Sequence, residues 1–429
     1  MNPNDDRESQ QGDAARNEAL WQQRFGERSE RMRASEIREL LKLLDQPDVI
    51  SFAGGIPDAA LFPQAEIASA YQAILAGPDA GAALQYSVSE GYRPLREWIV
   101  RHMRALGVPC GIDNIVITSG SQQALDFIAK LFLMQGDTAL VTWPTYLGAL
   151  QALNPYEPRY DKLPIDSNEP ASALAAAVID RARAAGSRPR LAYLVPDVSN
   201  PTGRTLDRAG RERLLDLIDA LDIPLIEDAA YQALRFEGTH EPSLLALEIA
   251  RRGDIEQTRT LYCGTFSKTL VPGLRVGWIC AAAPVVSKIV LIKQAGDLHS
   301  ATINQMVTHR LAESVYAAQV EKACAAYGTR RDAMLDALGR HMPKGVEWTV
   351  PEGGMFIWLT LPPHLDATIL LAEAVTSERI AYVPGGAFFP DGSGRNTARL
   401  SFSSASPARI EEGISRLGRL IAGKIAKAA

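Results

Sequence analysis

The sequence predicts an α/β fold in which helices flank a mostly parallel sheet, together with a smaller α+β unit. Two observations support this prediction. From about residue 75 to 305, short β-rich runs alternate with helical periodicity, which is typical of a parallel sheet wrapped by helices. Beyond about residue 310, the pattern changes to a long helical stretch (307–342), three short strands (346–350, 355–361 and 398–403) and a final helix.

Six short runs provide the strands expected in the larger unit. In chain order they are NIVIT (114–118), TALVTW (138–143), RLAYLV (190–195), IPLIE (223–227), TRTLYCG (258–264) and RVGWICAA (275–282). Aliphatic, β-branched and aromatic residues dominate these runs, as expected for strands buried on both faces.

The smaller unit is expected to be discontinuous in sequence. Residues 1–16 carry almost nothing apolar, and we expect them to be a disordered tail. Residues 17–74 contain a capped helix, a short strand and a Gly/Pro-rich loop, which is too little to fold alone. We therefore expect them to form an arm that packs with residues 310–429, while residues 75–309 form the large domain.

Composition argues against several classes of partner. The 429 residues carry a net charge of −5 without a long run of one sign, so no nucleic-acid or membrane-surface footprint is present. No stretch reaches the charge-free length of about 18 residues that a membrane span needs. Four cysteines without C-x-x-C spacing and six scattered histidines indicate neither a disulfide framework nor a metal site. A cytoplasmic protein is expected.

Polar residues follow four of the predicted strands, at the sheet edge where ligands bind in open α/β folds. They are the glycine-containing helix entry Ser119–Gln122, then Asn200, then Asp228 with Tyr231, and finally Thr265, Ser267, Lys268 and Arg275. Taken singly, each has an ordinary explanation as a helix cap, a turn or a surface group. Together, two cations, a carboxylate, a phenol, an amide and two hydroxyls suit a phosphorylated cofactor better than a core.

Three motifs carry a resemblance to a known family. SNPTG (199–203), DAAY (228–231) and SK (267–268) with an arginine seven residues after the lysine occur in this order. With them the chain resembles the fold-type I pyridoxal-phosphate enzymes, and among these the class I and II aminotransferases, from about residue 30 onward. The segments SEIRELLKL, FAGGIP, LQYSVSEGY, GSQQALD, GGMFIW and VPGGAFF are similar to the 2-aminoadipate and kynurenine aminotransferase subgroup.

The resemblance implies a seven-stranded sheet, pyridoxal 5′-phosphate as the cofactor and a homodimer with shared active sites. It also implies that Lys268 forms the Schiff base and moves the proton, and that Asp228 pairs with the pyridine nitrogen. Asn200 and Tyr231 are implied to bind the ring 3-oxygen. Phosphate binding is implied for Ser121, Gln122, Thr265, Ser267 and Arg275, ring stacking for Tyr146, and a phosphate contact across the subunit interface for Tyr86.

The resemblance places the substrate-binding residues with less detail. Arg399 in ARLSFS is implied to bind the α-carboxylate, with Asn200 and Gly55 beside it. Arg38 in SEIRELL aligns with an arginine that binds the side-chain carboxylate of aminoadipate or glutamate, although a helix-surface arginine needs no such role. Tyr146, in turn, also fits a core aromatic beside Pro144.

These roles imply an aminotransferase that transfers the amino group of an L-amino acid to a 2-oxo acid such as 2-oxoglutarate by a ping-pong mechanism. Aminoadipate or glutamate is the expected donor, and aromatic or aliphatic donors are also admitted. A β-lyase, decarboxylase or racemase using the same cofactor is the alternative. Aminotransferase-like transcription regulators would need a DNA-binding domain before residue 30, and a nucleotide binder would need a G-x-G-x-x-G or P-loop motif that the sequence lacks.

Overall fold

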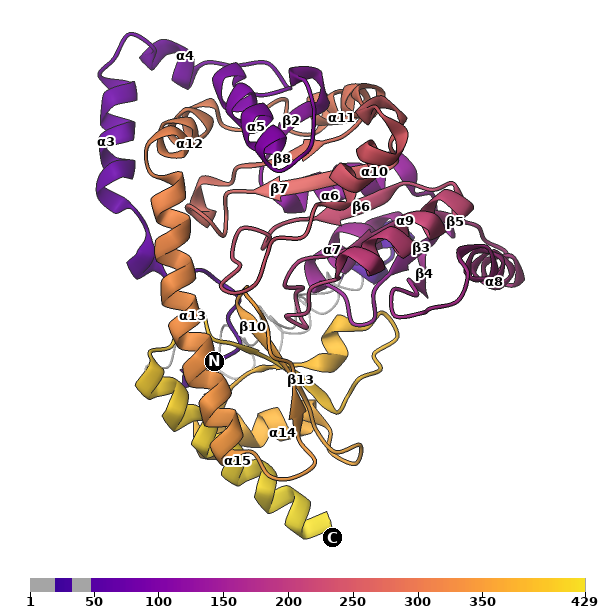
Figure 1. Cartoon of the computed structure of the whole chain (residues 1–429), viewed down its shortest axis with the longest axis vertical. Coiled ribbons are helices and arrows are strands. Elements are labelled where there is room, and N and C mark those ends of the chain that lie inside the picture. The colour runs from indigo at the N-terminus through magenta and orange to yellow at the C-terminus, as the bar shows by residue number, and fades with distance from the viewer. Residues whose placement is uncertain (1–19, 33–47, 429) are drawn as a thin grey trace, which may run out of the picture.

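The computed structural model describes residues 20–32 and 48–428. Figure 1 shows an upper and a lower unit. A seven-stranded sheet forms the centre of the upper unit, and the lower unit contains a four-stranded sheet. The strand order of the larger sheet is β2-β8-β7-β6-β5-β3-β4. Strand β8 is antiparallel to both of its neighbours, and all the other pairs are parallel. The predicted mostly parallel, seven-stranded α/β sheet is therefore confirmed.

Most of the large sheet is buried on both faces. Its strands are β2 (Ile115–Thr118), β3 (Thr138–Val141), β4 (Arg159–Lys162), β5 (Pro189–Leu194), β6 (Leu225–Asp228), β7 (Thr260–Thr265) and β8 (Gly277–Cys280). Every residue of β2, β3, β6, β7 and β8 is buried, whereas the edge strand β4 has no buried residue.

Helices cover both faces of this sheet, because alternate strand residues point to opposite sides. In β2, Val116 belongs to a core cluster that includes residues of α6, α7 and α11, whereas Ile115 and Ile117 belong to a second cluster that includes residues of α5, α10 and α12. Helices α8 and α9 cover β3 and β5 through Leu140 and Ala192. The bounds are α5 (Arg93–Ala105), α6 (Ser121–Phe132), α7 (Leu147–Leu153), α8 (Ala171–Ala184), α9 (Arg208–Leu221), α10 (Leu244–Arg252), α11 (Ala283–Gly296) and α12 (Thr302–Ser314).

The smaller unit contains segments from both ends of the chain. Its antiparallel sheet has the order β12 (Val383–Pro384), β13 (Thr397–Ser401), β10 (Phe356–Thr360) and β9 (Glu347–Trp348). Helices α13 (Tyr316–His341), α14 (Ala367–Glu373) and α15 (Pro407–Ala428) pack beside it. Strand β1 (Ile50–Ser51) pairs in parallel with β11 (Ile380–Ala381), so this part of the N-terminal arm lies on the C-terminal unit.

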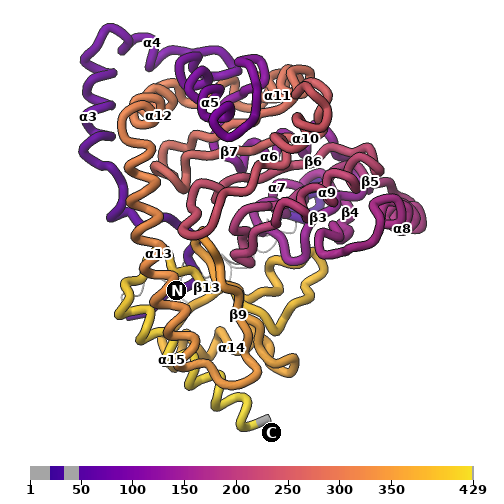
Figure 2. The backbone as a smooth tube through the Cα atoms, in the orientation of Figure 1, coloured from indigo at the N-terminus to yellow at the C-terminus, as the bar shows by residue number. Residues whose placement is uncertain are grey.

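Two helices link the units. The long helical stretch predicted after residue 307 consists of α12 and α13, which are separated at Val315, where the backbone leaves the helical region (φ −129°, ψ −1°). Helix α13 runs from the upper unit into the lower one (Figure 2). Position 310 lies inside α12, and the domain boundaries themselves stay a prediction. Helices α3 (Gln64–Leu75) and α4 (Ala80–Leu84) extend along the side of α12.

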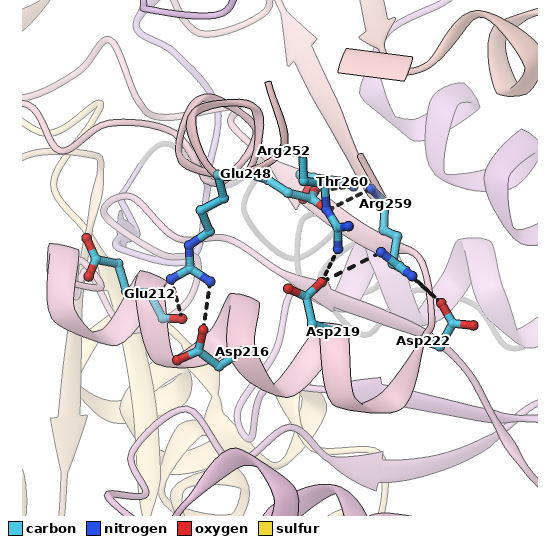
Figure 3. Close-up of polar contacts among 9 residues, drawn as sticks. Glu212, Asp216, Asp219, Asp222, Glu248, Arg252, Arg259 and Thr260 are labelled. Carbon is cyan, nitrogen blue, oxygen red and sulfur yellow. Dashed lines mark hydrogen bonds and ion pairs between the residues drawn. The ribbon is translucent and has the colours of Figure 1, made fainter. Parts of the chain in front are cut away.

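Ion pairs join helices α9 and α10 to the start of β7 (Figure 3). The buried Glu248 carboxylate accepts hydrogen bonds from the backbone N–H (2.9 Å) and hydroxyl (2.7 Å) of Thr260 and from Arg252 Nε (3.0 Å). Arg252 also bridges to Asp219 on α9. Exposed ion pairs contribute little, but a buried carboxylate with several donors fixes the position of the strand that leads to the site.

Candidate active site

A cavity of about 430 Å³ lies beyond the carboxyl ends of β6 and β7. Nine of the residues predicted for the site line it: Ser121, Gln122, Tyr146, Asp228, Tyr231, Thr265, Ser267, Lys268 and Arg275. They come from four separate stretches of the chain, and the parallel strands bring them to one edge of the sheet. Leu147, Gly148, Gln151, Val195, Ala230 and Pro272 complete the lining.

Asp228 ends strand β6 and is 2 % exposed. Its Oδ2 accepts a hydrogen bond from the hydroxyl of Tyr193 at 2.9 Å, and Oδ1 accepts one from the N–H of Ala230 at 3.3 Å. Burial nevertheless raises the pKa of Asp228 to about 6. The preceding residue, Glu227, points to the other face of the sheet, where it accepts bonds from the first N–H groups of α10. Only the second of these adjacent acids therefore faces the cavity.

Lys268 follows strand β7 and extends toward the N-terminal arm. Its Nζ donates to the carbonyl oxygen of Gly55 at 3.4 Å and lies 5.8 Å from the centre of the Tyr231 ring. Burial, and secondarily the cations Arg399 and Arg275, lower the pKa of Lys268 to about 8. Relative to an ordinary lysine, this raises the neutral, nucleophilic fraction at pH 7 by about 300-fold.

Arg399 is 2 % exposed and lies beside Asn200 and Tyr231. Its Nη1 donates to Asn200 Oδ1 at 2.9 Å, its Nη2 donates to the carbonyl oxygen of Ala53 at 3.0 Å, and Asn200 Nδ2 donates to the Tyr231 hydroxyl at 3.3 Å. Burial lowers the pKa of Arg399 to about 10. Among the described residues, its buried Nε has no hydrogen-bond partner. A buried cation with a donor to spare is suited to binding an anion.

The N-terminus of α6 and Arg275 border the cavity together. The first N–H groups of a helix lack intrahelical partners and favour a negative ligand. Arg275 Nη2 donates to the carbonyl oxygen of Ser119 at 3.1 Å, one residue before the capping Gly120. Gly120 has a φ of 81°, a left-handed conformation that favours glycine, and a Cβ there would lie 2.5 Å from Arg275 Nη2 and so displace the guanidinium. The Gln122 side chain donates to the carbonyl oxygen of Gly148 at 2.7 Å, which orients it within the cavity wall.

Two hydroxyls and an aromatic ring complete the wall. Thr265 Oγ1 donates to Ser267 Oγ at 2.9 Å and accepts from the Ser267 N–H at 3.1 Å, which fixes the turn before Lys268. Tyr146 lines the cavity and also packs on the core, so its position agrees with both predicted roles, a ring-stacking aromatic and a core aromatic. A Cβ at Gly148 would overlap the Tyr146 ring, which explains the small residue there. Burial raises the pKa of Tyr146 to about 12.

Tyr86, Gly55 and Arg38 are three further residues predicted for the site. Tyr86 is 79 % exposed, with its ring against His299 (centroids 6.0 Å apart), and does not line the cavity of this chain. Gly55 lies against Arg399, since a Cβ there would be 3.4 Å from Nη2. Arg38 lies outside the described residues.

Sequence reasoning missed Tyr193, the hydrogen-bond donor to Asp228. It pairs with Ile226 in the register of β5 and β6, which places its side chain on the same face as Asp228 two residues on. The signal was a single hydroxyl among the apolar residues that end β5, whose sequence is PRLAYL. Recognising this signal requires knowledge of which strands are neighbours in the sheet, and the local sequence pattern does not contain that order.

The fold and the site define a class of enzyme. A lysine with a lowered pKa, a buried carboxylate and an anion seat at a helix N-terminus surround one cavity, and Arg399 has a donor to spare. This donor set fits pyridoxal 5′-phosphate, whose aldehyde, ring nitrogen and phosphate need these three kinds of partner.

Comparison with known proteins gives the family. The family model for aminotransferase class I and II matches residues 47–417, and the chain belongs to this family. It is a pyridoxal-phosphate-dependent aminotransferase. A 2-aminoadipate transaminase of Thermus thermophilus is 41% identical over 406 residues, covering 95% of this chain and 98% of that protein. An aromatic-amino-acid aminotransferase of Thermococcus litoralis is 40% identical over 409 residues, covering 95% and 96%.

Solved structures show the same similarity. The alpha-aminoadipate aminotransferase of Thermus thermophilus, complexed with N-(5′-phosphopyridoxyl)-L-leucine, has a TM-score of 0.85 at 39% identity and covers 95% of this chain and 99% of that chain. The Pyrococcus horikoshii kynurenine aminotransferase also has a TM-score of 0.85 at 39% identity, covering 94% and 97%.

None of the helices within residues 20–32 and 48–428 is both long and apolar enough to cross a membrane. Over the same ranges, no group of three or more His, Cys, Asp or Glu side chains is arranged to hold a metal ion. The four cysteines are free thiols, three of them buried.

Proposed function

We propose that this aminotransferase takes the amino group of 2-aminoadipate or glutamate, and also of aromatic or aliphatic amino acids, and passes it to a 2-oxo acid such as 2-oxoglutarate. Arg399 is the observation that carries the amino acid part of the proposal, because its buried guanidinium has a free donor beside Lys268 and Tyr231. The breadth of donors is supported by nearly equal identity to a 2-aminoadipate transaminase and an aromatic-amino-acid aminotransferase.

The cavity residues would hold the cofactor in four ways. Lys268 would bind it covalently, and Asp228 would keep a proton on its ring nitrogen. Asn200 and Tyr231 would hydrogen-bond its 3-oxygen, and Tyr146 would lie against its ring. The phosphate would be held by Ser121, Gln122, Thr265, Ser267 and Arg275. When bound, pyridoxal phosphate supplies an electron sink for the pair left on Cα after its proton departs.

Two residues would act on the substrate. The planar fork of Arg399 binds the α-carboxylate bidentately and so fixes the orientation of the Cα–H bond relative to the cavity. Lys268, whose pKa is about 8, is a neutral base in a useful fraction at neutral pH and moves the proton away from Cα.

Homodimerisation in the cytoplasm, with Tyr86 reaching the partner's phosphate seat, is the remaining part of the proposal. Leu84, Tyr86 and Val88 are 71%, 79% and 58% exposed, and Leu298, next to His299, is 42% exposed. Apolar side chains gathered at the surface in this way favour an interface. Mixing inactive Lys268→Ala chains with Tyr86→Ala chains should raise activity above that of Tyr86→Ala alone, because hybrid dimers contain one intact site. No gain on mixing would contradict a shared site.

A panel of amino donors against 2-oxoglutarate tests the reaction and its specificity. We expect glutamate formation from 2-aminoadipate and, at lower efficiency, from leucine and phenylalanine, with parallel lines in double-reciprocal plots. Full turnover by Lys268→Ala, or the absence of any productive donor, would overturn the proposal. Arg38→Ala should raise the KM for aminoadipate more than that for leucine, and equal effects would remove Arg38 as a side-chain reader.

A further inference from the structure

A buried lysine lies behind the cavity wall, on helix α11. Lys293 has no exposed surface, and its Nζ donates to Gln123 Oε1, to both carboxylate oxygens of Asp297 and to Ser300 Oγ, all at 3.0 Å. The Asp297 side chain is 30% exposed. None of these four residues lines the cavity. We call them, together with Ser119, the Lys293 network.

The network ends on Ser119, the residue before Gly120 and the start of α6. The N–H of Ser119 donates to Gln123 Oε1 at 2.8 Å, and its hydroxyl lies 3.0 Å from Ser300 Oγ and 3.4 Å from Asp297 Oδ2. Gln123 Nε2 also donates to Asp297 Oδ2 at 2.8 Å, which closes the set. Lys293 therefore orients the oxygen atoms that hold the N–H and the hydroxyl of Ser119.

The remaining polar group of Ser119 faces the cavity side. Its carbonyl oxygen accepts the hydrogen bond from Arg275 Nη2. One residue thus receives the network on its N–H and hydroxyl and holds Arg275 with its carbonyl. The following residue, Gly120, has a left-handed φ of 81° and directly precedes α6. Small backbone rotations at Ser119 would therefore redirect the first N–H groups of α6.

Packing alone does not call for a charge at position 293. Nζ lies 5.8 Å from the Phe127 ring, between α11 and α6, where an apolar side chain would fill the space. Burying an ammonium group costs several kcal/mol unless well-placed partners compensate it, and an apolar replacement is often no less stable. A buried charge whose partners Gln123, Asp297 and Ser300 all contact Ser119, just before α6, fits a role in positioning.

We propose that Lys293 is a positioning residue, which acts through Gln123, Asp297 and Ser300 to hold Ser119 and thereby align Arg275 and the α6 N-terminus for the cofactor phosphate. This inference rests on the proposed assignment of that helix N-terminus and Arg275 as the phosphate seat. The network acts on the phosphate end, whereas Lys268 and Asp228 serve the aldehyde and the ring.

Equilibrium binding of pyridoxal 5′-phosphate and of phosphate-free pyridoxal to the cofactor-stripped chain tests the inference. Lys293→Met should weaken binding of the phosphate ester by about tenfold, the loss of one charge-assisted contact, and change pyridoxal binding by less than about twofold. Asp297→Asn should have the same selectivity, and it provides the test if Lys293→Met does not fold. Lys288→Met, an exposed position on the same helix, is the matched control and should change neither ligand.

An Arg275→Met variant tests the proposed phosphate seat separately from the role of the Lys293 network. If it loses phosphate-ester affinity selectively while Lys293→Met and Asp297→Asn bind both ligands like the unmodified chain, the network inference is wrong and the phosphate seat stands. If Arg275→Met also shows no selective loss, the phosphate seat itself is wrong. Equal weakening of both ligands by a folded Lys293→Met variant would assign Lys293 a structural role and overturn the proposal.

Discussion

Replacing Tyr193 by phenylalanine removes one hydroxyl from a fully buried ring and leaves its packing in place. That hydroxyl donates to Asp228 Oδ2 at 2.9 Å, and hydrogen bonds to charged groups contribute about 1.5–3 kcal/mol. Since one pKa unit corresponds to about 1.4 kcal/mol, Tyr193→Phe should raise the pKa of Asp228 by about one to two units. The carboxylate form, which keeps the proton on the cofactor nitrogen, then prevails only at higher pH.

The pH profile of kcat/KM with a fixed amino donor measures this effect. We expect the acidic limb of the Tyr193→Phe profile to move up by about one pH unit, and kcat/KM at pH 6 to fall about fivefold, because the carboxylate fraction at that pH falls from about one half to about one tenth. Tyr382→Phe is the control, because Tyr382 is equally buried but donates to the carbonyl oxygen of Ala367 in the smaller unit. Superimposable profiles for Tyr193→Phe and the unmodified enzyme, or an equal displacement in Tyr382→Phe, would refute the reasoning.

Three further predictions follow from the same geometry. Because the folded-state pKa of Asp228 is about 6 against an ordinary value of 3.8, its contribution to stability falls as pH rises through this window. Asp228→Asn should therefore abolish turnover yet stabilise the cofactor-free chain above pH 6 by up to about 3 kcal/mol in thermal unfolding. Arg399→Lys should lower kcat/KM for amino acids about 10–100-fold and leave cofactor absorbance unchanged, since lysine lacks the bidentate fork. Arg252→Ala should lower the free energy of unfolding in urea by about 1–3 kcal/mol at unchanged kcat, because it removes the bonds to Glu248 and Asp219.

The strands that could be predicted from the sequence are those whose burial produces a run of apolar residues. All six runs named from the sequence overlap strands of the large sheet, because strands buried on both faces are rich in apolar residues. Strand β4 has the sequence RYDK and no buried residue, so no apolar run marks it. Its place in the sheet depends on pairing with β3, and its existence was implied only by the family resemblance.

The candidate site was predictable where a residue type and its spacing carry the chemistry. Asp228 ends β6, Lys268 follows β7 and Arg275 precedes the antiparallel β8, so all three lie at the same edge of the sheet and line one cavity. The roles of Tyr193 and Lys293 were not predictable, since Asp228 lies 35 residues from Tyr193 and Gln123 lies 170 residues from Lys293, and only tertiary packing brings these pairs together. The left-handed backbone of Arg275 (φ 55°) likewise carries no signal in the residue type.

The residues proposed to grip the carboxylate and to move the proton belong to different sheets. Arg399 lies on β13 of the four-stranded sheet, whereas Lys268 follows β7 of the seven-stranded one, and the 2.9 Å bond from Arg399 to Asn200 crosses the seam between them. A shift of one sheet relative to the other would change the distance between Arg399, proposed to bind the carboxylate, and Lys268, proposed to move the proton. Turnover in this enzyme therefore depends closely on how its two units are positioned relative to each other. Substitutions at the contact between the two sheets should lower kcat at a smaller perturbation than is needed to lower the melting temperature.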